Sequence, residues 1–97
     1  MNTTSSNPLL IEKEAIARLK FPEKEVLNSD EARKNRDLTL QRALSLGNLE
    51  KSKARIVFED ESGKKLVETT VWGITDKRII LKQGILIPIH RVHEVII

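Results

Sequence analysis

His90, His93 and Glu94 are the residues whose types and spacing come closest to a catalytic or metal-binding arrangement in this 97-residue sequence. One helical turn would bring the two histidines, three residues apart, to the same side of the chain. A zinc site needs further protein ligands, and no second cluster accompanies this pair. We therefore predict no metal site and interpret both histidines as ordinary surface or turn residues. A nucleic-acid contact by His90 is the alternative.

The sequence shows no other pattern typical of catalysis. It contains no cysteine, so a thiol nucleophile and a thiolate metal site are excluded. It has no glycine-rich phosphate loop, no Ser/His/Asp grouping and no paired carboxylates in an apolar setting. The sequence therefore predicts a protein that is not an enzyme, uses no cofactor and has no evident small-molecule substrate.

Basic side chains gather at the expected turns and strand ends of the second half of the chain. Residues 1–50 contain eight Lys/Arg and eight Asp/Glu, whereas residues 51–97 contain nine and six, so the net charge of +3 lies in the second half. Turns that converge at one end of a small β-barrel would form a rim that faces phosphates. The candidate nucleic-acid-binding residues are Lys64, Lys65, Lys77, Arg78, Lys82, His90 and Arg91.

A structural role for these basic residues is the alternative interpretation, in which they keep turns hydrated and strand edges unpaired. Acidic residues close by in the sequence would partly cancel the positive field. These are Glu59, Asp60, Glu61 and Asp76. The pattern therefore leaves RNA or DNA open as a partner.

Trp72 is the only tryptophan, and the chain has two phenylalanines and no tyrosine. Proteins that bind single-stranded nucleic acid stack bases on several exposed aromatic rings, each contributing ~1–3 kcal/mol. One ring does not form such a platform within a monomer. We therefore expect Trp72 to cover the hydrophobic core, although a ring of subunits would present several copies.

An antiparallel β-unit must position these side chains. From Lys53 onward, short runs of β-branched residues alternate with polar turns, and we expect strands at 54–59, 66–74, 78–82, 85–89 and 92–97. In the first, Ala54, Ile56 and Phe58 alternate with outward residues, as in a half-buried strand. Gln83-Gly84 is expected to make a tight hairpin between the third and the fourth. Gly73 indicates a bulge or bend, and Pro88 places its strand at an edge. One helical turn is expected at His90-Arg91, before the last strand. Because bending would bury one face and remove free edges, we predict a strongly bent, closed, five-stranded barrel.

The first half of the chain predicts helices, so the fold class is α+β. Residues 1–7 are small and polar and are expected to be a disordered tail. Asn7-Pro8 is typical of a helix start, and apolar residues at spacings of three and four predict an amphipathic helix as far as residue 20.

A second helix is expected to begin at Asn28 or Ser29 and to end at Gly47-Asn48, with a firm part over residues 36–46. The predicted organisation is thus a tail (1–7), a helical N-terminal extension (8–35), and a helix plus barrel (36–97).

Composition points to the cytoplasm. The absence of cysteine fits a reducing compartment. No apolar run approaches the ~20 residues of a membrane span, and residues 1–7 lack the pattern of a signal peptide. We therefore expect a cytoplasmic protein without a membrane partner.

A helix followed by five strands, with a bent second strand and a valine-rich last strand, resembles the Sm-like fold, one of the SH3-like barrels. The local sequence is most similar to the bacterial Hfq-type RNA chaperones. The matching residues are Asp76 in an acidic turn, the strand Ile79-Ile80-Leu81 followed by Lys82-Gln83, and His90 before the last strand. The resemblance covers about residues 36–97 and implies an RNA-binding protein.

This sequence also departs from the Hfq-type pattern. Arg78 stands where those proteins place an aromatic residue that stacks on a base, and Ile89-His90 replaces their Lys-His step. Ser62-Gly63 replaces their Asn-Gly turn. The resemblance therefore supports the fold more than the uridine pocket, and fold alone does not determine function.

Two functions of different classes remain as hypotheses. The first is a nucleic-acid-binding Sm-like module. The second is a protein-interaction or self-assembly module that uses the terminal strand and the first helix to bind another protein or form a homo-oligomer.

Overall fold

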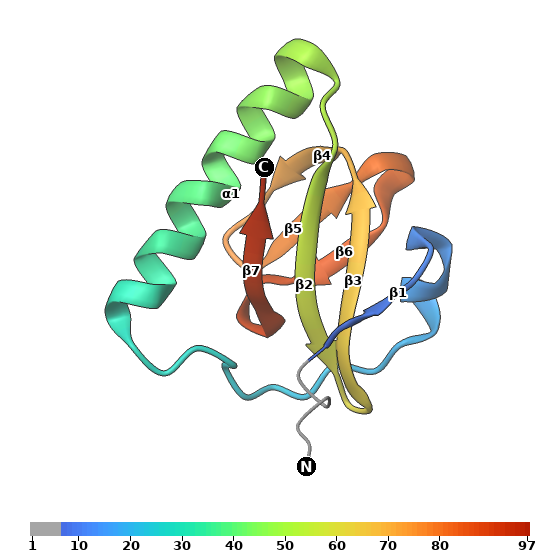
Figure 1. Ribbon diagram of the computed structural model, residues 1–97, viewed down its shortest axis with the longest axis vertical. Coiled ribbons are helices and arrows are strands. Elements are labelled where there is room, and N and C mark those ends of the chain that lie inside the picture. Colours follow the sequence, from blue (N-terminus) through green and yellow to red (C-terminus); the bar gives the residue numbers. More distant parts are fainter. Residues whose placement is uncertain (1–6) are drawn as a thin grey trace.

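The computed structural model of this protein describes residues 7–97, so the predicted tail lies, apart from Asn7, outside the described residues. The fold is α+β, with one long α-helix beside two β-sheets (Figure 1). In chain order the elements are β1 (Leu9–Leu10), η2 (Lys13–Arg18), α1 (Asp30–Glu50), β2 (Ala54–Asp60), β3 (Gly63–Thr69), β4 (Val71–Ile74), β5 (Arg78–Leu81), η3 (Lys82–Gly84), β6 (Leu86–Pro88), η4 (Ile89–Arg91) and β7 (Val92–Ile96). Within residues 7–97, no helix has the length and apolar character that crossing a bilayer requires.

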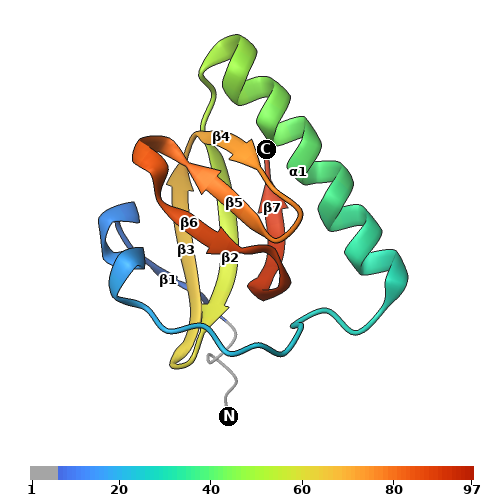
Figure 2. The same cartoon turned by 180° about the vertical axis from the view of Figure 1, so that it is seen from behind.

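The two sheets lie on opposite sides of the core. The first has the strand order β1-β3-β2-β7 and faces the viewer in Figure 1. The second has the order β4-β5-β6 and is in front in Figure 2. All neighbouring strands are antiparallel except β1, which adds to β3 in parallel.

The predicted closed barrel of five strands is not formed by the described residues, which contain seven strands in two sheets. The run predicted as one strand is divided at Thr70, where the chain passes from the first sheet to the second. Gly73 marks a bulge as predicted, because the register with β5 shifts between Val71 and Gly73. Pro88 lies on β6, an edge strand as predicted, and lacks the N–H that a further ladder would need. The 3₁₀ helix η2 contacts both β3 and β6 across the opening between the sheets.

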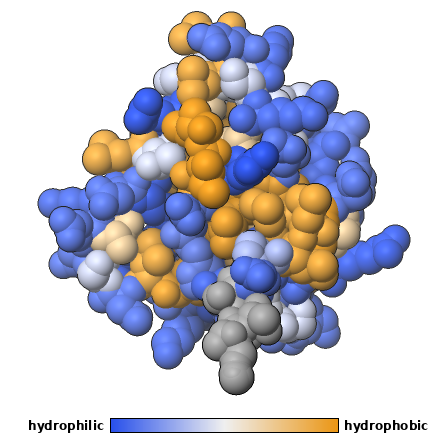
Figure 3. Space-filling model, in the orientation of Figure 1, coloured by the Kyte–Doolittle hydropathy of each residue, from blue (hydrophilic) through white to orange (hydrophobic). Residues whose placement is uncertain are grey.

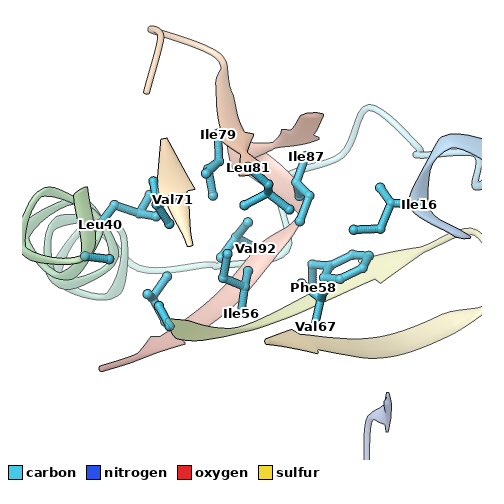
Figure 4. Packing of buried hydrophobic residues seen from close by; sticks show 13 residues of the cluster. Ile16, Leu40, Ile56, Phe58, Val67, Val71, Ile79, Leu81, Ile87 and Val92 are labelled. Atoms are coloured by element: carbon cyan, nitrogen blue, oxygen red, sulfur yellow. The ribbon is translucent and has the colours of Figure 1, made fainter. Parts of the chain in front are cut away.

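The hydrophobic core fills the space between the sheets (Figure 4). Side chains from β2 and β3 meet those from β5 and β6, while Leu40 of α1 approaches from one side and Ile16 of η2 from the other. The largest fully buried side chains are Phe58, Ile16, Leu40, Ile56, Ile79, Leu81, Ile87, Val67, Val71 and Val92. The predicted alternation of buried and outward residues along β2 is confirmed.

Helix α1 is longer than predicted. It begins at Ser29, one of the two predicted starts, where the Ser29 hydroxyl accepts a hydrogen bond from Ala32 N at 3.0 Å. It continues through Gly47 and ends at Lys51, which has a left-handed backbone with φ 58°. A Cβ atom at position 47 would lie 2.6 Å from the Val71 carbonyl oxygen. This glycine therefore permits close contact with β4, instead of stopping the helix.

The predicted helix over residues 8–20 was wrong. Leu9–Leu10 pairs with β3, Ile11 N donates to Leu66 O at 2.9 Å, and only Lys13–Arg18 is helical, in 3₁₀ form. A short isolated α-helix is marginal in water. The apolar residues at three- and four-residue spacings pack on the core from this irregular segment instead.

Residues 9–27 form what we call the N-terminal strap, which crosses the open side of the β-unit. The Phe21 ring lies 6.0 Å from the Phe58 ring, between centroids. Glu61 N donates to Lys20 O at 2.9 Å, and Val26 N donates to His90 O at 3.0 Å. The strap therefore contributes both apolar side chains and backbone hydrogen bonds to the folded unit.

Candidate nucleic-acid interface

The structure divides the seven candidate residues into a buried group, Lys65 and Arg91, and five that are partly or fully exposed. Lys65 belongs to the buried group, with 9% of its surface exposed. Its Nζ donates to Asp60 Oδ1 at 2.9 Å and to Ser62 Oγ at 3.0 Å. Burial would raise the pKa of Asp60, but hydrogen bonds from Lys65 and Ser62 hold it below its usual value. Lys65 therefore stabilises the β2–β3 turn and does not extend toward solvent.

Arg91 is also buried, with 6% of its surface exposed. Its Nε donates to Glu59 O at 2.9 Å, and its Nη1 donates to Lys24 O at 2.7 Å. The guanidinium group thus ties η4 to β2 and to the N-terminal strap. The sequence predicted that Arg91 contacts phosphate. In the structure its donors are instead used by backbone carbonyls that come from distant parts of the sequence.

The two histidines bind different partners. His90 Nε2 lies 2.9 Å from Pro22 O in the strap, and His93 Nε2 lies 2.7 Å from Glu59 Oε1 on β2. The predicted helical turn before the last strand is present as η4. No group of three or more metal-ligating side chains comes together within residues 7–97.

Lys64 lies apart from the remaining candidates. It is on β3 of the first sheet, where it pairs in register with Glu59. The other three, Lys77, Arg78 and Lys82, are exposed and belong to the second sheet or its turns. The chain has no Asp or Glu between Lys77 and His93.

Two turns hold these three cations at the ends of β5. The Thr75 hydroxyl accepts from Arg78 N at 2.9 Å and from Lys77 N at 3.2 Å, which fixes the turn before β5. After β5, Gln83 and Gly84 both have positive φ, and Leu81 N donates to Ile85 O at 2.7 Å. The predicted tight connection into β6 is therefore confirmed.

Trp72 lies beside these cations, contrary to the prediction that it covers the core. Its surface is 52% exposed. Gly73 pairs with Ile80 and Ile80 with Leu86, so these positions form one row across the outer face of the sheet. Val71, the residue before Trp72, is fully buried and pairs with Leu81, so alternation along β4 turns the indole outward. The bulge then places Gly73 on the outer face as well. The Trp-Gly step inside a strand was the sequence signal of this exposure.

We call the outer side of the second sheet the Trp72 face, made of Trp72, Arg78, Ile80, Lys82 and Leu86. Arg78, Ile80 and Lys82 share one side of the chain because strand side chains alternate. The three strands of this sheet contain no acidic residue. The face thus combines one exposed indole, aliphatic side chains and two cations.

An open groove of about 1080 Å³ borders this face, between the N-terminal strap and β6. Its lining includes Lys77, Arg78 and His90, but also acidic residues. The acidic residues are Glu23, Glu25, Asp37 and Asp76. Mixed charge makes the groove a poorer surface for a polyanion than the Trp72 face.

No protein-family model, no curated protein and no solved structure matches this chain. The predicted resemblance to Sm-like proteins therefore stays a prediction, and we infer function from the geometry of the Trp72 face.

Proposed function

We propose that this protein is a noncatalytic, cytoplasmic module that binds single-stranded nucleic acid, RNA foremost, on the Trp72 face. The observation that carries the proposal is the 52% exposure of the only tryptophan on a sheet face whose charged residues are all cations.

The chemistry of the face fits an unpaired strand. A base stacked on an exposed aromatic ring contributes ~1–3 kcal/mol, whatever its identity, because every base has a π-face. Ile80 and Leu86 extend the apolar surface next to the indole. Arg78 and Lys82 stand at the two ends of β5, where they can contact phosphates on either side of the stacked base.

The chain order supports a finer proposal, that the β-unit is Sm-like. With β3 and β4 counted as one bent strand, α1 precedes five strands, and the 3₁₀ turn η4 precedes the last. This is the order that the resemblance implies. The proposed relationship concerns the path of the chain, and the aromatic contact comes from β4 instead of the start of the third strand.

The alternative function is protein interaction through the first helix and the terminal strand, and its helical part has less support. The predicted amphipathic helix is replaced by β1, η2 and the extended part of the strap, whose apolar residues pack on the core.

Trp72 makes the proposal directly testable, because the chain has no other tryptophan and no tyrosine. Adding a single-stranded RNA oligonucleotide should quench its fluorescence. The variant R78Q/K82Q should bind more weakly and reduce the slope of log affinity against log salt by about 1.4, since each phosphate contact on a single strand contributes ~0.7. The same titration with a single-stranded DNA oligonucleotide tests DNA as the alternative partner.

The matched control is K34Q/R42Q, which removes two exposed cations from α1. It should leave both the quenching and the salt slope close to those of the unmodified protein. If R78Q/K82Q and K34Q/R42Q weaken RNA binding equally, binding depends on the net charge of the protein alone and not on the Trp72 face. An unchanged fluorescence at low salt would refute the proposal.

A further inference from the structure

The outer side of the first sheet differs in character from the Trp72 face. Three aligned positions, Val57, Leu66 and Leu10, form an apolar row across β2, β3 and β1. Val57 and Leu66 are half-buried, and Leu10 is 66% exposed. Figure 3 views this side and shows a hydrophobic area over the middle of the sheet, with hydrophilic surface around it.

Charged residues flank this apolar row in an alternating pattern. On one side, Arg55 pairs in register with Glu68, and on the other, Glu59 pairs with Lys64. Along each strand the sign therefore changes across the row: positive to negative on β2, and negative to positive on β3. We call these six residues of β2 and β3, together with Leu10, the Val57 face.

We propose that two copies of this protein associate through their Val57 faces, related by a two-fold axis that lies between the two sheets. If this axis runs across the strands, Arg55 of each copy meets Glu59 of the other, and Lys64 meets Glu68. If it runs along the strands, Arg55 meets Glu68 and Lys64 meets Glu59. The apolar rows meet in the centre in both cases. Glu94 of β7 continues the row beside Val57, so an axis across the strands would set it against Glu94 of the other copy. The axis along the strands brings only opposite charges together, and we therefore favour it.

Charge complementarity selects a second copy as the occupant. An alternating square of charges is self-complementary, as an interface with two-fold symmetry requires. The Trp72 face shows the contrast, because its strands contain a cation and no acidic residue, so two such faces would repel. Aligned packing of two sheets, at about 30° between strand directions, is a common geometry.

The size of the Val57 face predicts a weak dimer. Strands β2 and β3 each have seven residues. At about 3.3 Å per residue and about 4.8 Å between strands, the sheet offers on the order of 400 Å² of flat area. Standard interfaces bury about 800 Å² per partner, so we expect a dissociation constant in the micromolar range.

Sedimentation of the full chain, without nucleic acid, tests the proposal. The unmodified protein should pass from monomer to dimer with rising concentration. The variant R55E/K64E makes the face entirely negative, and E59Q/E68K removes its negative charge while the new amide at position 59 keeps an oxygen for His93. Each variant alone should dimerise about 100-fold more weakly, since like charges at an interface cost several kcal/mol. An equimolar mixture of the two should restore a dimer, now mixed.

A second pair of variants separates loss of the interface from loss of the fold. L66E places a charge in the apolar row, whereas L86E does the same at a 45% exposed leucine of the opposite sheet. L66E should abolish dimerisation and L86E should not, with circular dichroism checking that each is folded. A monomeric unmodified protein up to about 500 µM, which a micromolar dissociation constant excludes, would overturn the proposal. Self-association of both charge variants at the original strength would also overturn it.

Discussion

Single buried charges connect parts of this chain that are far apart in sequence. Arg36 of α1 is 7% exposed, and its Nη1 and Nη2 atoms each donate to a carboxylate oxygen of Glu25 at 2.8 Å. Its Nη1 also donates to Val92 O at 3.0 Å. One guanidinium group therefore joins the strap, α1 and β7. Burial alone would raise the pKa of Glu25, but the hydrogen bonds from Arg36 and Leu27 N lower it to about 2.

This carboxylate should make stability depend on pH. A carboxyl group whose folded pKa is depressed stabilises the fold above its unfolded pKa, near 4.5, and this contribution disappears as the pH falls through the folded value near 2. We expect E25Q to lower the free energy of unfolding at pH 7 by up to about 3 kcal/mol. In urea titrations, the difference in free energy of unfolding between E25Q and the unmodified protein should shrink as the pH falls from 4.5 to 2.

The control is E23Q, which alters an exposed glutamate two residues earlier in the strap. Its unfolding midpoint should follow that of the unmodified protein at every pH. If the free energy of unfolding of E25Q stays below that of the unmodified protein by the same amount down to about pH 2, the carboxylate charge does not contribute to stability.

At the scale of elements, α1 is held against the sheet by a glycine contact. Alanine at position 47 would improve helix propensity by about 1 kcal/mol. However, its Cβ would lie 2.6 Å from Val71 O and 3.1 Å from the Thr70 methyl carbon, and overpacking costs typically about 1–3 kcal/mol. The close contact should outweigh the propensity.

We therefore expect G47A to be less stable than the unmodified protein, measured as a lower thermal midpoint. N48A changes the next residue, which is exposed on α1, and should be neutral or slightly stabilising. A G47A protein as stable as N48A would show that α1 can move away from β4 without cost.

The N-terminal strap is the second element that closes the core. Ile16 is 2% exposed, and it fills the side of the core opposite Leu40 (Figure 4). We expect I16A to lower the free energy of unfolding by about 2–5 kcal/mol, because the cavity has little freedom to collapse. L9A, at a leucine that is 62% exposed in the same segment, should cost less than about 0.5 kcal/mol. Chemical denaturation measures both variants. If I16A and L9A lower the free energy of unfolding equally, the strap packs only loosely on the core.

At the scale of the whole molecule, the two sheets present outer faces with different charge patterns on opposite sides (Figure 1 and Figure 2). The Trp72 face is cationic, and the Val57 face carries both signs around an apolar row. Association through the Val57 faces would leave both Trp72 faces free. The proposed dimer would therefore offer two binding faces to one strand of nucleic acid.

This arrangement predicts a dependence on RNA length. An RNA long enough to reach both Trp72 faces should bind the dimer at least about tenfold more tightly than a short oligonucleotide, because the second contact becomes intramolecular. L66Q, an uncharged disruption of the Val57 face, should remove that gain and leave the affinity for the short oligonucleotide unchanged. Fluorescence titrations with both lengths measure the difference. A length effect that L66Q leaves intact would mean that the gain arises within one monomer.

Several features of the fold follow from short stretches of sequence. Alternating residues predicted the buried side of β2. The helix start at Asn28 or Ser29, the bulge at Gly73 and the edge position of Pro88 were also confirmed. Each depends on a local property, such as the two-residue period of a strand or the missing N–H of proline. These properties do not change with the position of distant residues, so a short segment suffices to predict them.

The tertiary structure alone decided which charged side chains are buried and which are available. The spacing of apolar residues in 8–20 predicted a helix. A helix this short is only marginally stable in water, so packing on the core determines the conformation of the strap. Lys65 and Arg91 looked like surface cations until Asp60 and the carbonyls of Glu59 and Lys24 came within hydrogen-bonding distance. The burial of a charge depends on partners that folding brings together, and short-range sequence patterns do not specify those partners.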